Sequence, residues 1–307
     1  MLLALAPMQD VTDVAFMRTL VRLGSLPDFF VTPYFRSTRT TCAMSEGPMA
    51  CITDNPSAVP IWAQLAGSEA AALVRDARAL LPLPIAGINL NVGCPSPLVN
   101  RHGAGAGLLR DLPRLREVCL ALREAVPAGR FSVKCRLGWS SADEFPGVLE
   151  VLAEAQPDML MVHARTRKAL YGGEPQREAT RAAVQRMACP VLVNGDIESA
   201  EAAAEWVAAV KAAGIMCGRG AVRNPYLFRL LRGGAPATRE ELRRYYATLL
   251  EETGRTLRHY TPAGHCNRMK KYLAYCYKDL APEAEHALRR CTEPGLMAGL
   301  LSEFSGS

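Results

Sequence analysis

The chain has 307 residues, of which 49% are apolar and 21% are charged, and this composition excludes disordered, collagen-like and fibrous proteins. No apolar run approaches the roughly 20 residues that cross a bilayer, so we expect no membrane partner. We interpret the apolar start, residues 1–8, as a buried strand rather than a signal peptide, since no basic segment precedes it. The ten cysteines occur without a CxxC pair, which predicts reduced thiols, no metal site and a cytoplasmic protein. We expect a monomer.

The net charge of +6 is unevenly distributed. The segment from Arg219 to Lys278 contains 13 Lys/Arg and 4 Asp/Glu, a local net charge of +9, together with seven of the nine tyrosines. Basic side chains interleaved with aromatic ones suit an RNA backbone that carries exposed bases. A basic helical surface that only keeps the protein in solution is the alternative.

Eight short apolar runs, several of them continuous, predict strands that are buried on both faces. They cover residues 2–6, 28–32, 59–65, 85–92, 131–137, 159–164, 191–194 and 214–218. Segments with helical periodicity lie between them, including residues 68–81, 112–125 and 199–213. This alternation predicts an α/β fold, a (β/α)₈ TIM barrel over residues 1–235, followed by an all-helical domain over residues 236–307.

Polar residues gather where the predicted strands end, and this end of a barrel is where active sites lie. In chain order they are Pro7, Met8, Gln64, Asn91, Cys94, Lys134, Arg136, His163, Asn194, Gly195, Asp196, Gly218 and Arg219. The loops around Gly195 and Gly218 follow the seventh and eighth strands, where barrels often bind phosphate, although both glycines could be ordinary turn residues. The glycines at 103, 105 and 107 do not open a helix after a strand, so we interpret them as a mobile loop beside Cys94.

Cys94 differs from the other cysteines because prolines hold it in a rigid turn at the predicted mouth of the barrel. With an ordinary pKa of about 8.5 its thiol is protonated at neutral pH and can act as an acid. Lys134, Arg136 and His163 would face the same cavity and could stabilise negative charge that develops there. The alternatives are an inert cysteine and barrel cations paired with carboxylates such as Asp196.

These residues resemble the tRNA-dihydrouridine synthases. The resemblance rests on ordered motifs from residue 6 to about residue 228, of which NxGCP at residues 91–95 combined with Lys-x-Arg at 134–136 is the most specific. Residues 137–141 and 266–273 are most similar to the bacterial C-type members, which act on uridine 16 of the D-loop.

The resemblance implies an FMN-binding barrel with a helical domain that grips tRNA. NADPH reduces the flavin, the flavin passes hydride to C6 of a uracil, and Cys94 protonates C5. The residues implied to bind the flavin are Pro7, Met8, Gln64, Lys134, His163, Asn194, Gly195, Asp196, Gly218 and Arg219. The residues implied to bind the substrate are Asn91, Arg136, Tyr171, Arg268, Lys270 and Lys271.

The sequence departs from the family pattern at three places. Asn89 replaces the usual Asp, Gln9 and Asp10 replace an acidic residue and a glycine, and Cys135 replaces an aliphatic residue. We expect Asn89 to lie deeper in the barrel with little effect, and Asp10 to alter the first loop over the flavin.

Three other functions remain open. A flavin barrel that acts on a small pyrimidine, like dihydroorotate dehydrogenase, would use the same chemistry but not the basic C-terminal segment. A non-catalytic RNA-binding barrel would not need Cys94. A phosphosugar isomerase would need a carboxylate base, and Asp196 is the only obvious one.

Overall fold

The computed structural model describes residues 1–40, 44–55, 57–277 and 281–304. Eight parallel strands form a closed barrel, because β2 pairs with both β1 and β4 and thereby joins the two ends of the sheet. The barrel strands are β1 (Leu2–Leu5), β2 (Phe29–Val31), β4 (Ile61–Ala66), β5 (Gly87–Val92), β6 (Phe131–Arg136), β7 (Met159–His163), β8 (Val191–Asn194) and β9 (Gly214–Cys217). The predicted barrel is confirmed, and all eight predicted strands are present.

A ninth strand, β3 (Phe35–Arg36), was missed because two residues carry no periodicity. It extends the sheet beyond the end of β4, where Arg36 lies opposite Ala66.

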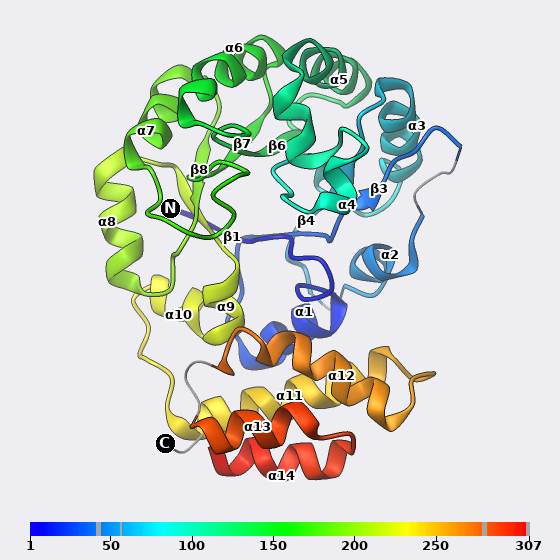
Figure 1. The fold of residues 1–307 in the computed structure, drawn as a ribbon, viewed down its shortest axis with the longest axis vertical. Coiled ribbons are helices and arrows are strands. Elements are labelled where there is room, and N and C mark those ends of the chain that lie inside the picture. Colours follow the sequence, from blue (N-terminus) through cyan, green and yellow to red (C-terminus); the bar gives the residue numbers. More distant parts are fainter. Residues whose placement is uncertain (41–43, 56, 278–280, 305–307) are drawn as a thin grey trace.

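Helices surround the barrel, as Figure 1 shows. The longer ones before residue 211 are α1 (Val14–Leu23), α2 (Glu46–Thr53), α3 (Ala70–Leu80), α5 (Leu112–Ala125), α6 (Phe145–Ala155), α7 (Arg177–Arg186) and α8 (Ala200–Val210). Short turns are α4 (Pro97–Asn100), η1 (Gly105–Arg110), η2 (Ala142–Glu144), α9 (Arg219–Arg223) and α10 (Leu227–Leu231). The Ser199 hydroxyl caps α8 by accepting from the Ala202 N–H. The helix predicted over residues 68–81 begins at Ala70, with Glu69 at its N-cap.

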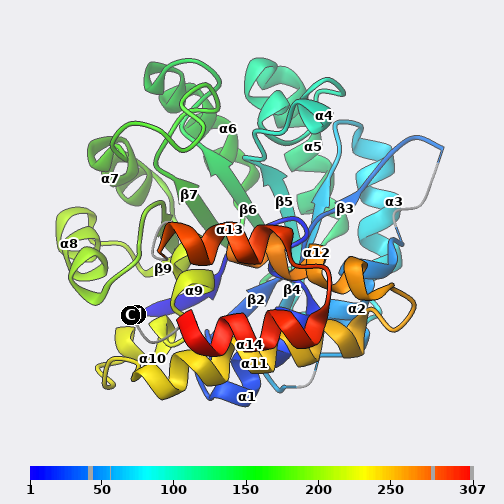
Figure 2. The same ribbon diagram turned by 60° about the horizontal axis from the view of Figure 1, so that its bottom comes forward.

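The remaining described chain is helical: α11 (Arg239–Thr256), α12 (Pro262–Leu273), α13 (Pro282–Arg290) and α14 (Pro294–Phe304). These four helices lie together on the side of the barrel next to α1 (Figures 1 and 2). The Thr238 hydroxyl starts α11 in a capping box with Glu241. Within the described residues, no helix is long and apolar enough to cross a membrane.

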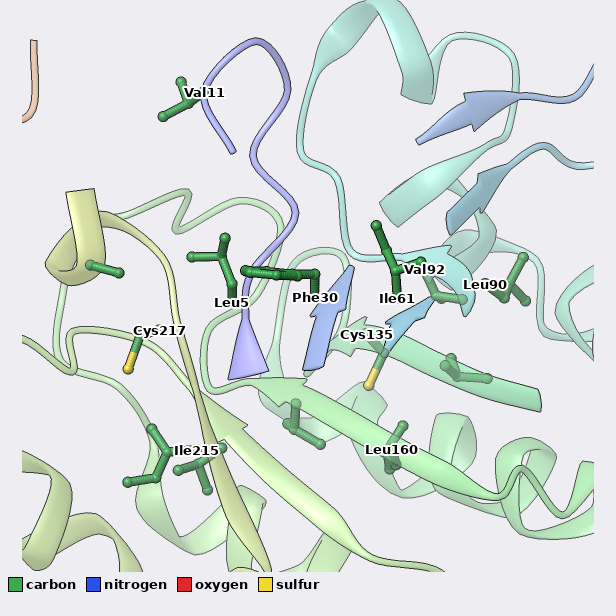
Figure 3. Close-up of a cluster of buried hydrophobic side chains, with 14 of the residues drawn as sticks. Leu5, Val11, Phe30, Ile61, Leu90, Val92, Cys135, Leu160, Ile215 and Cys217 are labelled. Carbon is green, nitrogen blue, oxygen red and sulfur yellow. The ribbon is translucent and has the colours of Figure 1, made fainter. Parts of the chain in front are cut away.

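The strands bury two layers of side chains because successive residues point to opposite faces. One layer packs between the strands and the helices, and Figure 3 shows some of its members, among them Leu5, Phe30 and Leu160. The other fills the barrel interior with Ala4, Val31, Trp62, Met161, Leu192, Met216 and their neighbours. Above this apolar plug the inward positions become polar, and there the site is built.

Candidate active site

The inward-facing positions of β6 carry the cations of the site. Phe131, Val133 and Cys135 belong to the outer hydrophobic layer, so Lys134 and Arg136 point into the barrel. In the register of the sheet, Arg136 lies opposite His163 of β7, and Lys134 lies opposite Asn91 of β5. The alternation of a buried strand therefore explains why these side chains meet.

Two adjoining cavities occupy the mouth of the barrel. The larger, of about 580 Å³, is lined by Pro7, Met8, Asn91, Cys94, Lys134, Arg136, His163, Tyr171 and Arg219, together with residues of the neighbouring loops. The smaller, of about 80 Å³, is lined by Pro7, Met8, Lys134, His163, Tyr171, Asn194, Gly195, Asp196, Gly218 and Arg219, again with neighbours. The larger volume lies in the range of small-molecule and cofactor sites. Thirteen of the residues named from the sequence thus line these two adjoining cavities.

Cys94 is held by hydrogen bonds on both sides of its peptide. Its N–H donates to the Asn91 side-chain oxygen (2.8 Å), and its carbonyl accepts from the Asn100 amide (2.8 Å) and from the Ala106 N–H (3.1 Å). A Cβ on Gly105 would lie 3.1 Å from the Cys94 Cβ, so the glycine permits this close packing. The glycine-rich segment therefore lies beside Cys94 as predicted. From Gly105 to Arg110 it forms a 3-10 turn with mostly buried residues, where we expected a loop.

Burial raises the pKa of the Cys94 thiol, an effect that a backbone hydrogen bond from Ser96 and the charge of Lys134 oppose only partly. The group is consequently a thiol, not a thiolate, at neutral pH. It can give a proton to a ligand in the cavity, whereas its reactivity as a nucleophile is suppressed.

A chain of buried amides runs beneath the cavity and ends at Cys94. Asn89 donates to the Ser132 hydroxyl (2.9 Å) and accepts from the Gln64 amide (2.7 Å). The Gln64 oxygen accepts from the Asn91 amide (2.8 Å), and the Asn91 oxygen in turn accepts from the Cys94 N–H. Both ends of the Gln64 amide are therefore hydrogen-bonded within the protein. Gln64 lies beneath the two cavities and does not line either of them. Asn89 lies deeper in the barrel, as expected for this departure from the family pattern. Its contact with Ser132 anchors the inner end of this series of amide hydrogen bonds.

Lys134 and His163 occupy the junction of the two cavities. Burial, together with the charge of Arg136, lowers the pKa of Lys134 to about 8, so this ammonium is charged at neutral pH and easily neutralised above it. Burial and the charges of Arg136 and Lys134 lower the pKa of His163 well below its ordinary value, so its imidazole is neutral. The Lys134 ammonium donates to the Asn194 side-chain oxygen (3.1 Å), and the Nε2 atom of His163 is buried with no hydrogen-bond partner.

Arg136 is almost fully buried and partly committed to the protein. Its guanidinium donates to the carbonyls of Gly93 (2.9 Å), Thr166 (2.8 Å) and Leu170 (2.6 Å). Burial lowers its pKa to about 10. Arg136 therefore clamps the loops after β5 and β7 around the cavity that it also lines.

Asp196 links two arginines at the smaller cavity. Its carboxylate accepts from the guanidinium groups of both Arg165 and Arg219. Burial favours the neutral acid, but the hydrogen bond from Arg165 and the charges of both arginines outweigh it and lower the pKa of Asp196. A carboxylate held in this way is a weak base, which argues against an isomerase that uses it.

Sequence reasoning assigned no role to Arg165, which lies two residues after His163. It is buried, its Nη1 atom has no hydrogen-bond partner, and that atom lies 3.8 Å from the position that a Cβ on Gly195 would take. Extending the two-residue alternation of β7 past its end would have found it.

Aromatic side chains cover the cavity. The exposed Tyr171 ring lies 4.7 Å from the Arg219 guanidinium carbon and 5.5 Å from that of Arg136. Tyr34, after β2, and Tyr275, after α12, also line the larger cavity, and neither was predicted. No sequence pattern indicated that Tyr275 reaches the barrel mouth from the C-terminal helices.

Three basic residues of α12 lie outside these two cavities. Arg268 binds the carboxylate of Asp13, which also accepts from the Tyr272 hydroxyl (2.8 Å). Lys271 donates to Asp10 (2.8 Å), a residue that adopts a left-handed φ of 61°, and Lys270 donates to Asn267 (3.2 Å). The unusual Asp10 thus binds α12 to the first loop. Lys278, at the end of the basic segment, lies outside the described residues.

Within the described residues, no group of three or more His, Cys, Asp or Glu is arranged to hold a metal ion. The donors that the two cavities offer are ammonium, guanidinium and amide groups, which suit an anionic and hydrogen-bonding ligand instead.

Comparison with solved structures supports the fold. The chain superposes on an old yellow enzyme homologue from Zymomonas mobilis with a TM-score of 0.56 and 14% identity, covering 77% of this chain and 89% of that one. A variant of the same Zymomonas mobilis protein gives a TM-score of 0.54 at 16% identity, covering 77% of this chain and 88% of that one. At this level of identity the likeness concerns the fold alone.

Sequence comparison is more specific. A tRNA-dihydrouridine(16) synthase from Salmonella typhimurium is 31% identical over 306 residues, which cover 94% of this chain and 96% of that protein. The protein of the same name from Cupriavidus necator is 32% identical over 309 residues, covering 94% and 92%. The model of the dihydrouridine synthase (Dus) family matches residues 4–297. With a family match over nearly the whole chain and a barrel mouth that assembles the motif residues, this protein belongs to the dihydrouridine synthase family.

Proposed function

We propose that this protein reduces the C5–C6 bond of uridine 16 in tRNA, with FMN as cofactor, NADPH as reductant and Cys94 as proton donor. One observation carries the proposal: a protonated, loop-held thiol lies in the same cavity as Lys134, Arg136 and His163, in a member of the dihydrouridine synthase family. The position in tRNA rests on relatives such as the Salmonella typhimurium and Cupriavidus necator proteins, whose names specify uridine 16.

The two cavities fit FMN. The smaller one brings Gly195, Gly218 and Arg219 together, so backbone N–H groups and a guanidinium can hold a phosphate there. The buried Nε2 of His163 and Nη1 of Arg165 are polar atoms without partners in the protein, and a bound anionic ligand would satisfy them. A Cβ on Gly218 would lie 3.3 Å from the Met8 sulfur, so the glycine lets Met8 pack closely against this loop at the edge of the smaller cavity. When bound, FMN supplies the hydride that reduces the ring.

Cys94 completes the reduction at the uracil. Hydride addition at C6 leaves negative charge on the ring, and protonation at C5 removes it. The buried thiol keeps its proton until a stronger base, the enolate, comes within reach. The amide chain through Asn91 fixes the Cys94 backbone, so the donor is held in position before the ring enters.

Lys134 stabilises the negative charge that hydride addition leaves on the uracil ring. Its ammonium is charged at neutral pH, and it lies in a buried setting where a charge acts more strongly than in water. The neutral His163 contributes a hydrogen bond instead of a charge, which keeps the cavity from accumulating an excessive positive potential. Arg136 shapes the loops and presents the edge of its guanidinium to the uracil.

The helical segment, residues 236–307, forms the tRNA-binding domain in this proposal, and residues 1–235 form the catalytic barrel. Arg268 and Lys271 act mainly by holding α12 against the first loop, through Asp13 and Asp10. Lys270 remains available for a phosphate, and Tyr275 brings an aromatic ring from this segment to the cavity. Extraction of a uridine from the folded D-loop costs a few kcal/mol, which such contacts can offset.

The test is whether tRNA reoxidises the reduced enzyme. The purified protein, loaded with FMN and reduced anaerobically with NADPH, is mixed with tRNA that lacks dihydrouridine, and flavin absorbance is followed. We expect reoxidation by this tRNA but not by fully modified tRNA. Reoxidation by free orotate or uracil in place of tRNA would contradict the proposal and favour a small-pyrimidine dehydrogenase. RNA binding with no flavin bound would favour the non-catalytic alternative.

A further inference from the structure

A third cavity, of about 350 Å³, lies beside the active site and has no part in the chemistry described above. It is formed where the loop after β3 meets the loop between β4 and α3, and it is lined by Tyr34, Arg36, Ser37, Arg39, Gly67 and His102, among others. Tyr34 also lines the larger active-site cavity, so the two cavities are neighbours on either side of this residue. A ligand that extends from the active site past Tyr34 would enter this cavity.

The cavity presents groups that bind an anion. Arg36 and Arg39 are both exposed toward solvent, and neither forms an ion pair with a carboxylate in the part of the chain that the structure describes. The Ser37 side chain is 7% exposed, lines the cavity, and its hydroxyl has no hydrogen-bond partner. A buried hydroxyl without a partner is rare and costly, and a ligand oxygen would satisfy it.

The first turn of α3 adds backbone donors. This helix has 11 residues, and its N-cap Glu69 makes no side-chain capping hydrogen bond, so the N–H groups of the first turn are not capped. A Cβ on Gly67 would lie 3.0 Å from both the Cβ and the carbonyl of Ser37, so the glycine brings this turn against the serine. Glu69 also lines the cavity and is the opposing charge, one carboxylate against two guanidinium groups.

The arginine-bearing loop is held in place before any ligand arrives. Arg75 of α3 donates to the carbonyls of Thr38 (2.9 Å) and Arg39 (3.2 Å), and the Ser37 N–H donates to the Ala66 carbonyl (2.9 Å). On the other side, the Ser68 hydroxyl donates to the His102 carbonyl (2.7 Å). Preorganisation of this kind reduces the entropy lost on binding.

We propose that this cavity binds the 2′-phosphate end of NADPH through Arg36, Arg39 and the Ser37 hydroxyl, and so makes the protein prefer NADPH to NADH. The inference rests on the proposed function, which needs a nicotinamide reductant at the active site. A terminal phosphate monoester carries nearly two negative charges at pH 7 and can enter a recessed pocket end-on, where two arginines match it. An RNA phosphodiester carries one charge and continues in both directions, so it suits an open groove better than a pocket with a buried hydroxyl at its floor.

The test uses the FMN-loaded protein and four variants: Arg36→Ala, Arg39→Ala, Ser37→Ala and, as a matched control, Arg186→Ala. Arg186 is an exposed arginine paired with Glu150 on the outer face of the barrel, so its loss removes the same charge far from the cavity. Adenosine 2′,5′-bisphosphate is the binding probe, with 5′-AMP as its counterpart, and calorimetry gives both dissociation constants. Flavin reduction by NADPH and by NADH is measured separately without tRNA.

We expect each arginine variant to weaken probe and NADPH binding by about tenfold or more, as for lost hydrogen bonds to a charged group, and Ser37→Ala to weaken them less. NADH, 5′-AMP and tRNA affinities should stay unchanged, as should all affinities of the control. An equal loss for NADPH and NADH, or unchanged probe binding, overturns the proposal. Weakened tRNA binding with unchanged probe binding also overturns it and assigns the arginines to RNA. A wild-type protein that binds the probe but forms no dihydrouridine would leave this site standing while the proposed function fails.

Discussion

The barrel mouth and the C-terminal helices are both rich in basic residues, but they use them differently. Among the described residues that line the larger cavity there is no carboxylate, and Lys134 there binds a neutral amide, although Arg219 is paired with Asp196 of the smaller cavity. In and around the C-terminal helices the cations are bound to acids: Arg268 to Asp13, Lys271 to Asp10 and Arg229 to Glu241. The first arrangement costs stability and leaves charge for a ligand, whereas the second contributes to holding the molecule together.

A charge count in the sequence therefore does not measure the charge available to a partner. The +9 of residues 219–278 marks these residues as a candidate RNA surface. Much of that charge is spent on contacts within the protein, such as the pair formed by Arg255 and Glu251 on α11. The smaller cluster at the mouth consists of Lys134, Arg136 and His163. It indicates a ligand site more clearly, because Lys134 and Arg136 are buried there without a carboxylate partner in the described part of the chain.

The largest effect is expected at the mouth, from Cys94→Ala. Loss of the proton donor should lower the rate of dihydrouridine formation by about 10²-fold or more, while flavin content and flavin reduction by NADPH stay unchanged. Cys189→Ala, at a half-buried cysteine outside both cavities, is the matched control. A turnover rate for Cys94→Ala equal to that of the control would remove Cys94 from the mechanism.

The next largest effect is on stability, and we expect it from Asp13→Ala, where the first loop contacts the C-terminal helices. Asp13 caps α1 by accepting from the Phe16 N–H (3.1 Å), and it also binds Arg268 and Tyr272. Asp13→Ala should lower the free energy of unfolding in urea by about 3 kcal/mol, because it removes a cap and leaves a mostly buried guanidinium without its close partner. Lys271→Ala breaks an exposed pair and should cost about 1 kcal/mol or less. Equal losses for the two variants would contradict the distinction between buried and exposed pairs.

A smaller effect follows from the neutral His163. Its pKa is lowered in the folded protein, whereas in the unfolded chain it titrates near 6.5, so below that pH the unfolded chain binds more protons and stability falls. Between pH 7 and pH 5.5 the wild type should lose about 1 kcal/mol more than His163→Gln, measured by urea unfolding at both pH values. Parallel losses in the two proteins would show that His163 is protonated in the folded state.

The smallest effect separates two neighbouring lysines. Lys271 is paired with Asp10, whereas Lys270 contacts only a neutral amide among the described residues, so Lys270→Ala should weaken tRNA binding more than Lys271→Ala. It should also reduce the slope of the logarithm of the binding constant against that of the salt concentration by about one. The reverse order would mean that the pair with Asp10 opens when tRNA binds.

Much of the barrel could be predicted because buried parallel strands leave short, continuous apolar runs, and the two-residue alternation then placed Lys134 and Arg136 inside. Side-chain contacts between different strands and loops produce no such pattern in the sequence. The engagement of Gln64 between Asn89 and Asn91, the arginine clamp on Asp196, and the reach of Tyr275 to the mouth depend on register and packing between distant segments. Periodicity within one segment carries no information about them.

Formation of dihydrouridine can be measured on tRNA itself. tRNA from cells that lack dihydrouridine is incubated with the protein, FMN and NADPH, digested, and mapped by mass spectrometry for a uridine that has gained two hydrogens. We predict this gain at position 16 of the D-loop and at no other uridine. A flavin that NADPH reduces, with no gain at any uridine in tRNA, would contradict it.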